Sequence, residues 1–246
     1  MPDWRYSGSG IANRRAARRG TGSQGAPMTM FAKQHWPRWI QQQLVRRGIE
    51  DERVLAAFAA VPRAEFVAPH QREYAENDAP LPIGCGQTVS QPYVVARSLA
   101  ALALRGHETV LDIGTGSGYQ AVLLSHLAAE VYTIEIFQEL YINSRLLIER
   151  LQKHPVHTRQ GDGSLGWPEA APFDAIVGGA CAPKVPPALL EQLAPGGRMV
   201  LPVGSDTSQV LTCFIKQPDG SVKKQYLDPV MFVPLLGKQG TGRMPG

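Results

Sequence analysis

The sequence Leu-Asp-Ile-Gly-Thr-Gly-Ser-Gly-Tyr-Gln, residues 111–120, decides the fold of this chain of 246 residues. Residues 109–111 predict the strand that leads into it, and residues 121–124 predict the start of a helix. A strand that turns through glycines into a helix points free backbone N–H groups at one place, and glycine lets a ligand approach closely. We therefore expect a ligand-binding loop at residues 112–120.

The spacing of the glycines restricts which ligand this loop can hold. Gly114, Gly116 and Gly118 follow the pattern Gly-x-Gly-x-Gly, whereas a pyrophosphate-binding dinucleotide fold has Gly-x-Gly-x-x-Gly. Asp112 stands two residues before the first glycine, where its charge would repel a pyrophosphate. The loop suits a ligand with a cationic or hydroxyl-bearing part. In this it resembles the nucleotide loop of S-adenosylmethionine-dependent methyltransferases.

Strand-like and helix-like segments alternate through most of the chain. Strands are predicted at 109–111, 131–135, 156–160, 173–177, 198–203, 209–216 and 222–233, and helices at 92–104, 121–124, 137–151 and 187–193. Such alternation is typical of βαβ units with right-handed crossovers. We therefore expect an α/β fold with a doubly wound, mostly parallel, seven-stranded sheet.

The composition divides the chain into four regions. Residues 1–30 are rich in Gly, Ser, Arg and Ala and predict a disordered basic tail. Residues 31–80 predict a small N-terminal helical subdomain, and residues 81–236 the main α/β domain. Residues 237–246 predict a loose tail.

Local signals give the N-terminal subdomain its expected form. The first helix is expected to end at Gly48 with a left-handed cap, and the second to begin after Asp51 as its N-cap. The segment 63–81 predicts a loop, which Phe66 and Tyr74 are expected to anchor.

The formal net charge of +4 at first suggests a nucleic-acid partner. Residues 1–30 contain five arginines and one aspartate, so they carry all of this excess, and the other residues balance 20 basic against 20 acidic side chains. A neutral domain lacks the electrostatic footprint of a nucleic-acid binder. We therefore expect no nucleic-acid partner.

The sequence also bears on compartment, metal and assembly. No apolar run approaches the length of a membrane span, and residues 1–30 lack the apolar segment of a signal peptide. The three cysteines, Cys85, Cys181 and Cys213, are far apart and predict neither a metal site nor a disulfide framework. We expect a cytoplasmic protein without a metal or membrane contact and, since nothing supports a dimer, a monomer.

Three polar signals fall at the carboxyl ends of predicted parallel strands, where ligands bind in open α/β sheets. The glycine loop follows the first of these strands, Glu135 ends the second, and Asp162 follows the third. Glu135 is placed to accept hydrogen bonds from a ribose diol, and Asp162 could accept one from an adenine amino group. Either acid alone is an ordinary feature of a strand end. The three together predict an adenosine cofactor.

Upstream, the sequence Gln-Thr-Val-Ser-Gln-Pro at residues 87–92 leaves two interpretations of Ser90 open. Ser90 can be the N-cap of the helix that starts at Pro92, a role worth about 1 kcal/mol. Alternatively, its hydroxyl faces the cofactor and holds an incoming carboxylate. No Ser–His–Asp arrangement follows from the spacing, so a hydrolytic nucleophile is not indicated.

Seven short motifs appear in order along residues 34–236. They are Pro82-Ile83-Gly84, Gln87 to Tyr93, Leu111 to Gln120, Gly161-Asp162-Gly163, Ala171 to Ile176, Gln192-Leu193 with Pro195-Gly196-Gly197, and Phe232-Val233-Pro234-Leu235. Many methyltransferases share the glycine loop, whereas Thr-Val-Ser-Gln-Pro and Phe-Val-Pro-Leu are much more selective. The set resembles the protein-L-isoaspartate O-methyltransferase family.

The resemblance implies an enzyme that transfers the methyl group of S-adenosyl-L-methionine to the free carboxylate of isoaspartyl residues in damaged proteins. The ester then collapses to a succinimide, which reopens partly to normal aspartate. The resemblance implies that Ser90 is the active-site serine and that no metal is needed. It implies cofactor contacts at Val89, Asp112, Gly114, Thr115, Gly116, Gly118, Glu135, Asp162 and Gly163, with Asp112 at the amino-acid end of the cofactor.

The sequence departs from the family pattern in places. Ile136 stands where the family often has arginine, and Gly178-Gly179 stands where many members have a β-branched residue before a small one. The extra glycine predicts a looser substrate side of the cleft. Two alternatives remain, namely another methyltransferase that acts on RNA or a small molecule, and a non-catalytic cofactor-binding protein. The neutral charge of the main domain argues against RNA.

Overall fold

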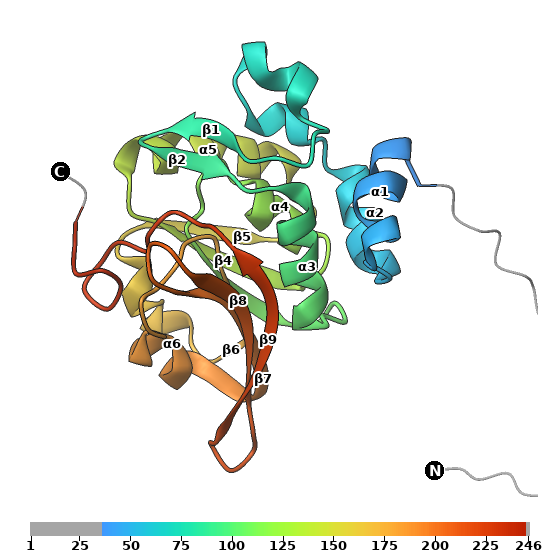
Figure 1. Cartoon of the computed structure of the whole chain (residues 1–246). Coiled ribbons are helices and arrows are strands. Elements are labelled where there is room, and N and C mark those ends of the chain that lie inside the picture. The colour runs from blue at the N-terminus through green and yellow to red at the C-terminus, as the bar shows by residue number, and fades with distance from the viewer. Residues whose placement is uncertain (1–35, 245–246) are drawn as a thin grey trace, which may run out of the picture. The chain divides into compact units, whose positions relative to one another are not determined.

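The structure is a computed structural model, which describes residues 36–244 (Figure 1). The basic tail predicted at 1–30 lies outside the described residues, as do residues 31–35 and 245–246. Within residues 36–244, no helix is long and apolar enough to cross a membrane.

A seven-stranded sheet forms the centre of the fold. In sheet order, the strands are β5 (Val156–Gln160), β4 (Glu130–Glu135), β3 (Thr109–Ile113), β6 (Phe173–Gly178), β7 (Leu193–Gly204), β8 (Gln209–Lys216) and β9 (Val222–Val230). The first five strands are parallel, and β8 and β9 are added antiparallel. The predicted doubly wound, mostly parallel sheet is confirmed.

Helices cover both faces of this sheet because its strands are apolar on both faces. Successive residues of a strand point to opposite sides, and Val110 and Leu111 accordingly belong to two separate buried clusters. The first cluster includes residues of α3 (Pro92–Leu102), α4 (Tyr119–Ser125) and α5 (Gln138–Leu151). The second includes Leu189 of α6 (Pro187–Gln192).

The helices that precede the sheet follow their local signals. They include α1 (Arg38–Gln43), a 3-10 helix η1 (Val45–Arg47) and α2 (Glu52–Ala60). Gly48 has a φ of 89° and ends η1, and the Asp51 carboxylate accepts the N–H groups of Arg53 and Val54. The Asp51 cap and the left-handed conformation of Gly48 are therefore confirmed, but the first helix itself ends earlier, at Gln43, and Gly48 ends only η1. Phe58 of α2 packs edge-on against Tyr119 of α4, so α2 belongs to the same buried core as α4.

The segment after α2 is more regular than predicted. It forms two 3-10 helices, η2 (Arg63–Phe66) and η3 (Pro69–Tyr74), and then a hairpin of β1 (Leu81–Gly84) and β2 (Gln87–Val89). Phe66 is buried, as expected, but the prediction of Tyr74 as an anchor is wrong, since its side chain is 47% exposed. The neighbouring Ala75 is buried in its place.

The C-terminal segment, defined here as residues 237–244, is not the loose tail that the sequence predicts. The backbone N–H of Gly237 donates to the carbonyl of Arg243, and that of Thr241 donates to Leu235. The N–H groups of Lys238 and Gln239 donate to side chains in the loop after β5. Polar and glycine-rich composition suggested a loose tail, but acceptors distant in sequence hold these amides.

Candidate active site

The glycine loop joins β3 to α4 at the carboxyl ends of the parallel strands. The N–H groups of Gly114 and Thr115 donate to the carbonyl of Ile134 on β4, at 2.9 and 3.1 Å. Gly118 has a φ of 89°, and a Cβ atom there would lie 2.9 Å from Ile148 Cγ1 on α5. Because both the backbone conformation and the contact exclude a side chain at 118, the loop can lie close against α5.

Glu135 ends β4 beside this loop and is 3% exposed. Its Oε2 accepts the N–H of Gly116 at 2.7 Å, and its Oε1 accepts the N–H of Phe137 at 2.9 Å. Burial raises the pKa of Glu135 above its ordinary value, while these backbone hydrogen bonds act in the opposite direction. Each carboxylate oxygen keeps acceptor capacity after one hydrogen bond, so Glu135 can still accept from a ligand hydroxyl.

Asp112 lies behind the glycine loop and is fully buried. Gln120 Nε2 donates to its Oδ1 and the Thr133 hydroxyl donates to its Oδ2, both at 2.8 Å. The Thr115 and Thr133 hydroxyls are 2.7 Å apart, which extends this network to the loop. Burial raises the pKa of Asp112 to about 7, although the two side-chain hydrogen bonds act to lower it.

Asp162 faces the C-terminal segment. Its Oδ1 accepts the N–H and the hydroxyl of Ser164, at 2.9 and 2.6 Å, and its Oδ2 accepts the N–H of Lys238 at 2.7 Å. Gly163, the next residue, lines a cavity together with Glu135. The structure therefore brings Gly163 to Glu135 and ties Asp162 to the end of the chain.

Three adjoining cavities follow the carboxyl edge of the sheet, and Thr88 and Gly179 line all three. The Glu135 cavity is also lined by Gly114, Gly116, Ile136, Gly163 and Leu235. The loop cavity is lined by Val89, Ser90, Gly114, Thr115, Gly116 and Gln120. The Ser90 cavity, of about 450 Å³, is lined by Ser90, Gln91, Val94, Met231, Phe232 and Val233.

The predicted site residues thus divide into two groups. Those that line the three cavities are Val89, Ser90, Gly114, Thr115, Gly116, Glu135 and Gly163. Those that line none of the three are Asp112, Gly118 and Asp162, which support the loops from behind. A direct contact of Asp112 or Asp162 with the cofactor stays a prediction.

Ser90 is half-buried between β2 and α3 and does not cap the helix. The N-cap position of α3 is Gln91, and no side chain at that position accepts a hydrogen bond. The Asp78 carboxylate instead accepts the N–H of Tyr93 at 2.9 Å, in the first turn of α3. The cap interpretation of Ser90 is therefore wrong. Within residues 36–244, the Ser90 hydroxyl has no hydrogen bond to another protein group.

Comparison with known proteins identifies the family of this chain. The family model described as protein-L-isoaspartate(D-aspartate) O-methyltransferase matches residues 38–240. The chain belongs to this family. The enzyme named protein-L-isoaspartate O-methyltransferase 2 from Marinobacter nauticus is 52% identical over 202 residues, 82% of this chain and 92% of the relative. A relative from Anaeromyxobacter dehalogenans is 56% identical over 190 residues, 76% of this chain and 91% of the relative.

Solved structures agree with this assignment. The structure of a putative family member from Plasmodium falciparum, in complex with S-adenosyl-L-homocysteine, superposes with a TM-score of 0.71 at 27% identity. The superposition covers 80% of this chain and 96% of the other. This protein-L-isoaspartate O-methyltransferase family uses S-adenosyl-L-methionine as methyl donor. The glycine loop, with the acceptor oxygens of Glu135 beside it, fits such an adenosine-bearing group.

The paired glycines after β6 have a packing role in this methyltransferase. A Cβ atom at Gly178 would lie 2.3 Å from Leu201 Cδ2 on β7, so a side chain there has no space. The Gly179 N–H donates to the carbonyl of Ile113 at 2.9 Å. Gly178 therefore packs closely against β7, and the expected loosening of the cleft stays a prediction.

Sequence reasoning missed Gln209, which holds one wall of the Ser90 cavity. Gln209 is 5% exposed, its Oε1 accepts the N–H of Phe232 at 2.6 Å, and its Nε2 donates to the Phe232 carbonyl at 3.2 Å. The carbonyl of Cys181 accepts the N–H of Leu235, and the N–H of Cys181 donates to the carbonyl of Val233. A glutamine at the start of a strand carries no local signal for a contact 23 residues away.

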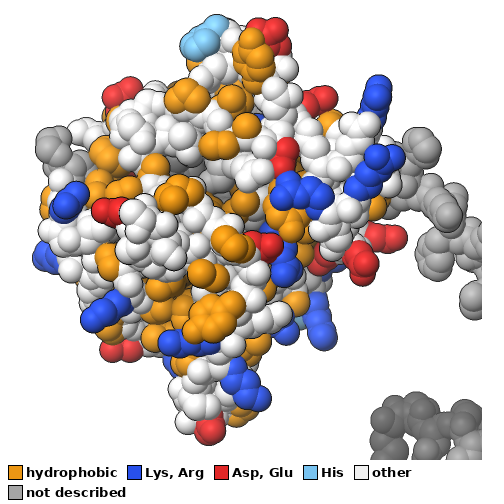
Figure 2. Space-filling view, viewed as in Figure 1, with side chains coloured by type: hydrophobic (Ala, Val, Ile, Leu, Met, Phe, Trp, Pro, Cys, Tyr) orange, Lys and Arg blue, Asp and Glu red, His pale blue; other side chains and the backbone are white. Residues whose placement is uncertain are grey.

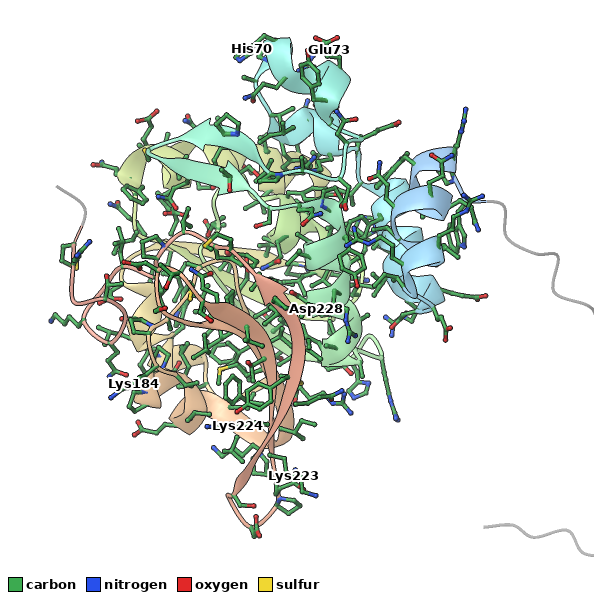
Figure 3. The ribbon with its side chains drawn as sticks, viewed as in Figure 1. His70, Glu73, Lys184, Lys223, Lys224 and Asp228 are labelled. Carbon is green, nitrogen blue, oxygen red and sulfur yellow. The ribbon has the colours of Figure 1, made fainter. Side chains whose placement is uncertain are left out.

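The surroundings of the cleft are not dominated by one charge. On the face seen in Figure 2, apolar side chains gather near the middle, and acidic and basic side chains are interspersed around the margin. Lys223 and Lys224 project from the part of β9 near the β8–β9 turn, and Asp228 lies further along the strand toward α3 (Figure 3). Asp228 Oδ2 pairs with Arg97 Nε at 2.9 Å, which ties β9 to α3. Within residues 36–244, no cluster of three or more His, Cys, Asp or Glu side chains is placed to hold a metal ion.

Proposed function

We propose that this site methylates the free carboxylate of isoaspartyl residues in proteins, with Ser90 as the residue that holds the carboxylate. One observation carries this proposal. Ser90, whose hydroxyl has no protein partner within residues 36–244, lines both the loop cavity and the Ser90 cavity. A donor methyl group on one side of Ser90 and an acceptor carboxylate on the other would therefore meet at this hydroxyl.

The cofactor side is held by the glycine loop and by Glu135. When bound, S-adenosyl-L-methionine supplies a methyl group activated on a sulfonium. Glu135 accepts hydrogen bonds from the ribose hydroxyls, because its oxygens retain acceptor capacity beside Gly116 and Phe137. Val89 and Thr115 line the loop cavity next to Ser90 and shape the space for the amino-acid part.

The acceptor side requires no general base. A carboxylate is already ionised at neutral pH, so the reaction needs alignment with the methyl group and removal of water. The Ser90 hydroxyl donates to one carboxylate oxygen and leaves the other free to attack. Met231, Phe232 and Val233 give the Ser90 cavity one apolar wall beside the acceptor. Proximity and desolvation then supply most of the rate.

The partner of this chain is a protein that contains isoaspartate, and neither nucleic acid nor membrane is required. The balance of 20 basic and 20 acidic side chains outside residues 1–30 favours this choice over RNA. The cysteine pattern favours the cytoplasm as compartment, and we propose a monomer. Light scattering on the purified full chain measures the assembly directly.

One assay tests the proposed function. The purified chain is incubated with methyl-labelled S-adenosyl-L-methionine and one of three acceptors, namely an isoaspartyl peptide, the same peptide with aspartate, or an RNA oligonucleotide. We expect label only in the isoaspartyl peptide. Label in the RNA would support the alternative methyltransferase. Label in none of them, although calorimetry detects cofactor binding, would contradict both activities.

A further inference from the structure

Arg63 is a buried cation whose guanidinium binds backbone carbonyls of two segments, residues 75–79 and residues 89–90. It is 3% exposed, at the start of η2. Its guanidinium donates to five carbonyl oxygens, those of Ala75 at 2.9 Å, Asn77 at 3.4 Å, Ala79 at 2.9 Å, Val89 at 3.3 Å and Ser90 at 3.1 Å. One side chain thus ties the segment 75–79 to the backbone of Ser90.

Asp78, in that same segment, holds the turn from its other side. Its Oδ1 accepts the N–H of Tyr93, and its Oδ2 accepts Gln91 Nε2 at 2.7 Å. Oδ2 also pairs with Arg47, whose guanidinium lies over the Tyr93 ring. Ser90 is therefore fixed through its own carbonyl by Arg63, and through Gln91 and Tyr93 by Asp78.

General stability does not explain this arrangement well. Burying a guanidinium is costly unless a carboxylate and further hydrogen bonds compensate it. Among the described residues, no carboxylate lies within hydrogen-bond distance of Arg63, and its Nε is buried without a partner. The planar fork of arginine does, however, fix several acceptors in one geometry, which the single ammonium of lysine cannot do.

We propose that Arg63 and Asp78 are positioning residues for Ser90. Together they hold the Ser90–Gln91 turn so that the hydroxyl points to the junction of the loop cavity and the Ser90 cavity. Neither residue lines any of the three cavities of the cleft. They act through Ser90 and touch neither the cofactor nor the acceptor, and this inference rests on the proposed role of Ser90.

The test compares Arg63→Lys with a control at a more exposed arginine, Arg53→Lys. Arg53 also donates to two backbone carbonyls, those of Leu104 and Leu127, and it lines none of the three cavities. For each variant, kcat and KM are measured with the isoaspartyl peptide, cofactor Kd by calorimetry, and folding by thermal melting. Arg63→Lys is then combined with Ser90→Ala in a double-mutant cycle.

We expect Arg63→Lys to lower kcat about 10- to 100-fold, since a small misplacement of a reacting group has effects of this size. Cofactor Kd should stay within about threefold of the wild type. In the Ser90→Ala background, the same change should lower kcat by less than about threefold, because the residue that it positions is already gone. Arg53→Lys should leave kcat unchanged.

Several outcomes would overturn the inference. They are an unchanged kcat in Arg63→Lys, an equal loss in the control, or the same fold-loss with and without the Ser90 hydroxyl. If Arg63→Lys does not fold, Asp78→Asn decides in its place, because an amide nitrogen at Oδ2 would meet the Gln91 and Arg47 donors, and an unchanged kcat there would refute the idea. Failure of the proposed function is distinguishable, since the wild type would then methylate no isoaspartyl peptide.

Discussion

Ser90 combines an open hydroxyl with a tightly held backbone. The residue is placed by Arg63 through its carbonyl, while its side chain has no partner within residues 36–244. A serine at the start of a helix is more often a cap, but here Asp78 takes that role from 14 residues before Pro92. The hydroxyl therefore stays available to an acceptor carboxylate.

Removal of this hydroxyl should separate catalysis from cofactor binding. For Ser90→Ala, we expect kcat to fall about 10- to 100-fold, because the carboxylate loses its alignment with the methyl group. Cofactor Kd, measured by calorimetry, should not change. Ser98→Ala on α3 is the control, because the Ser98 hydroxyl donates to the carbonyl of Val94. A kcat of Ser90→Ala equal to that of the wild type would show that Ser90 has only a structural role.

Glu135→Gln should mainly weaken the cofactor. The backbone N–H groups of Gly116 and Phe137 donate to different oxygens of Glu135, and an amide would turn its NH₂ toward one of them. We expect cofactor Kd to rise about 10- to 100-fold, as for loss of hydrogen bonds to a charged group. The control is Glu130→Gln, at the other end of the same strand. A Kd equal to that of the wild type would show that Glu135 supports the loop only.

Asp112 gives the stability a defined dependence on pH. Its pKa is raised by burial to about 7 in the folded chain, from an ordinary value near 3.8. Between these values the folded chain binds more protons than the unfolded chain, so stability should fall as pH rises toward 7 and then stop changing on this account. From pH 5 to 7, the loss from this group is on the order of 2 kcal/mol.

Urea unfolding at pH 5 and pH 7.5 measures this dependence. In Asp112→Asn, where the side chain does not titrate, the decrease between the two pH values should be smaller than in the wild type. Gln120 and Thr133 still have a polar partner in that variant. Equal decreases in both proteins would show that Asp112 does not cause the effect.

At the scale of elements, the wall of the Ser90 cavity depends on a contact between β8 and the segment that follows β9. β9 ends at Val230, before the predicted end at 233. Beyond this point, the side chain of Gln209 forms the hydrogen bonds to the backbone. The side-chain amide of Gln209 accepts from the N–H of Phe232 and donates to its carbonyl, as a residue of a neighbouring strand would do. The position of Met231 to Val233 is thereby fixed without a strand.

Gln209→Leu should therefore affect the acceptor more than the cofactor. We expect KM for the isoaspartyl peptide to rise roughly tenfold, since two buried hydrogen bonds are lost. Cofactor Kd should stay unchanged, because Gln209 lies behind the acceptor wall. Gln225→Leu on the exposed part of β9 is the control. A KM within twofold of the wild type would show that the wall holds its place without Gln209.

Elements that are formed by interactions between neighbours in sequence could be predicted, whereas those formed by distant contacts could not. The glycine loop, the alternating strands and helices, and the caps at Gly48 and Asp51 depend on neighbours in sequence, so their patterns predicted them correctly. The end of β9 depends on a distant partner, Gln209, and its place was predicted wrongly. The role of Asp78 at α3 is of the same kind, because no pattern near Ser90 reveals an acceptor 12 residues upstream.

At the scale of the whole molecule, the end of the chain returns to the cofactor side of the sheet. The C-terminal segment donates from Lys238 to Asp162 and from Gln239 to Ser164, and Gln239 Oε1 accepts the N–H of Ala188. The loop after β5, α6 and the C-terminal segment thus form one connected edge. Composition alone could not predict this connection, because glycine-rich ends are usually loose.

A chain that stops at Leu236 should lose this connection. We expect a lower melting temperature, by roughly 2–4 °C for each kcal/mol of lost contacts. Cofactor affinity should weaken too, because Asp162 and Ser164 lose the donors that hold their loop. A chain that stops at Met244 is the control and keeps these contacts. If the shorter chain melts and binds like the full chain, the C-terminal segment does not support the cofactor side.

The hydrogen bonds to Asp162 also bear on the ageing of the enzyme itself. Asp162 precedes Gly163, and a glycine has no side chain to hinder its backbone nitrogen from attacking the preceding carboxyl group. Isoaspartate forms readily at such Asp–Gly pairs, so this loop contains a site that is open to the type of damage that the family repairs. Ser164 and Lys238 hold the carboxylate with three hydrogen bonds and restrict that ring closure. We therefore expect the docked end of the chain to slow this reaction at Asp162.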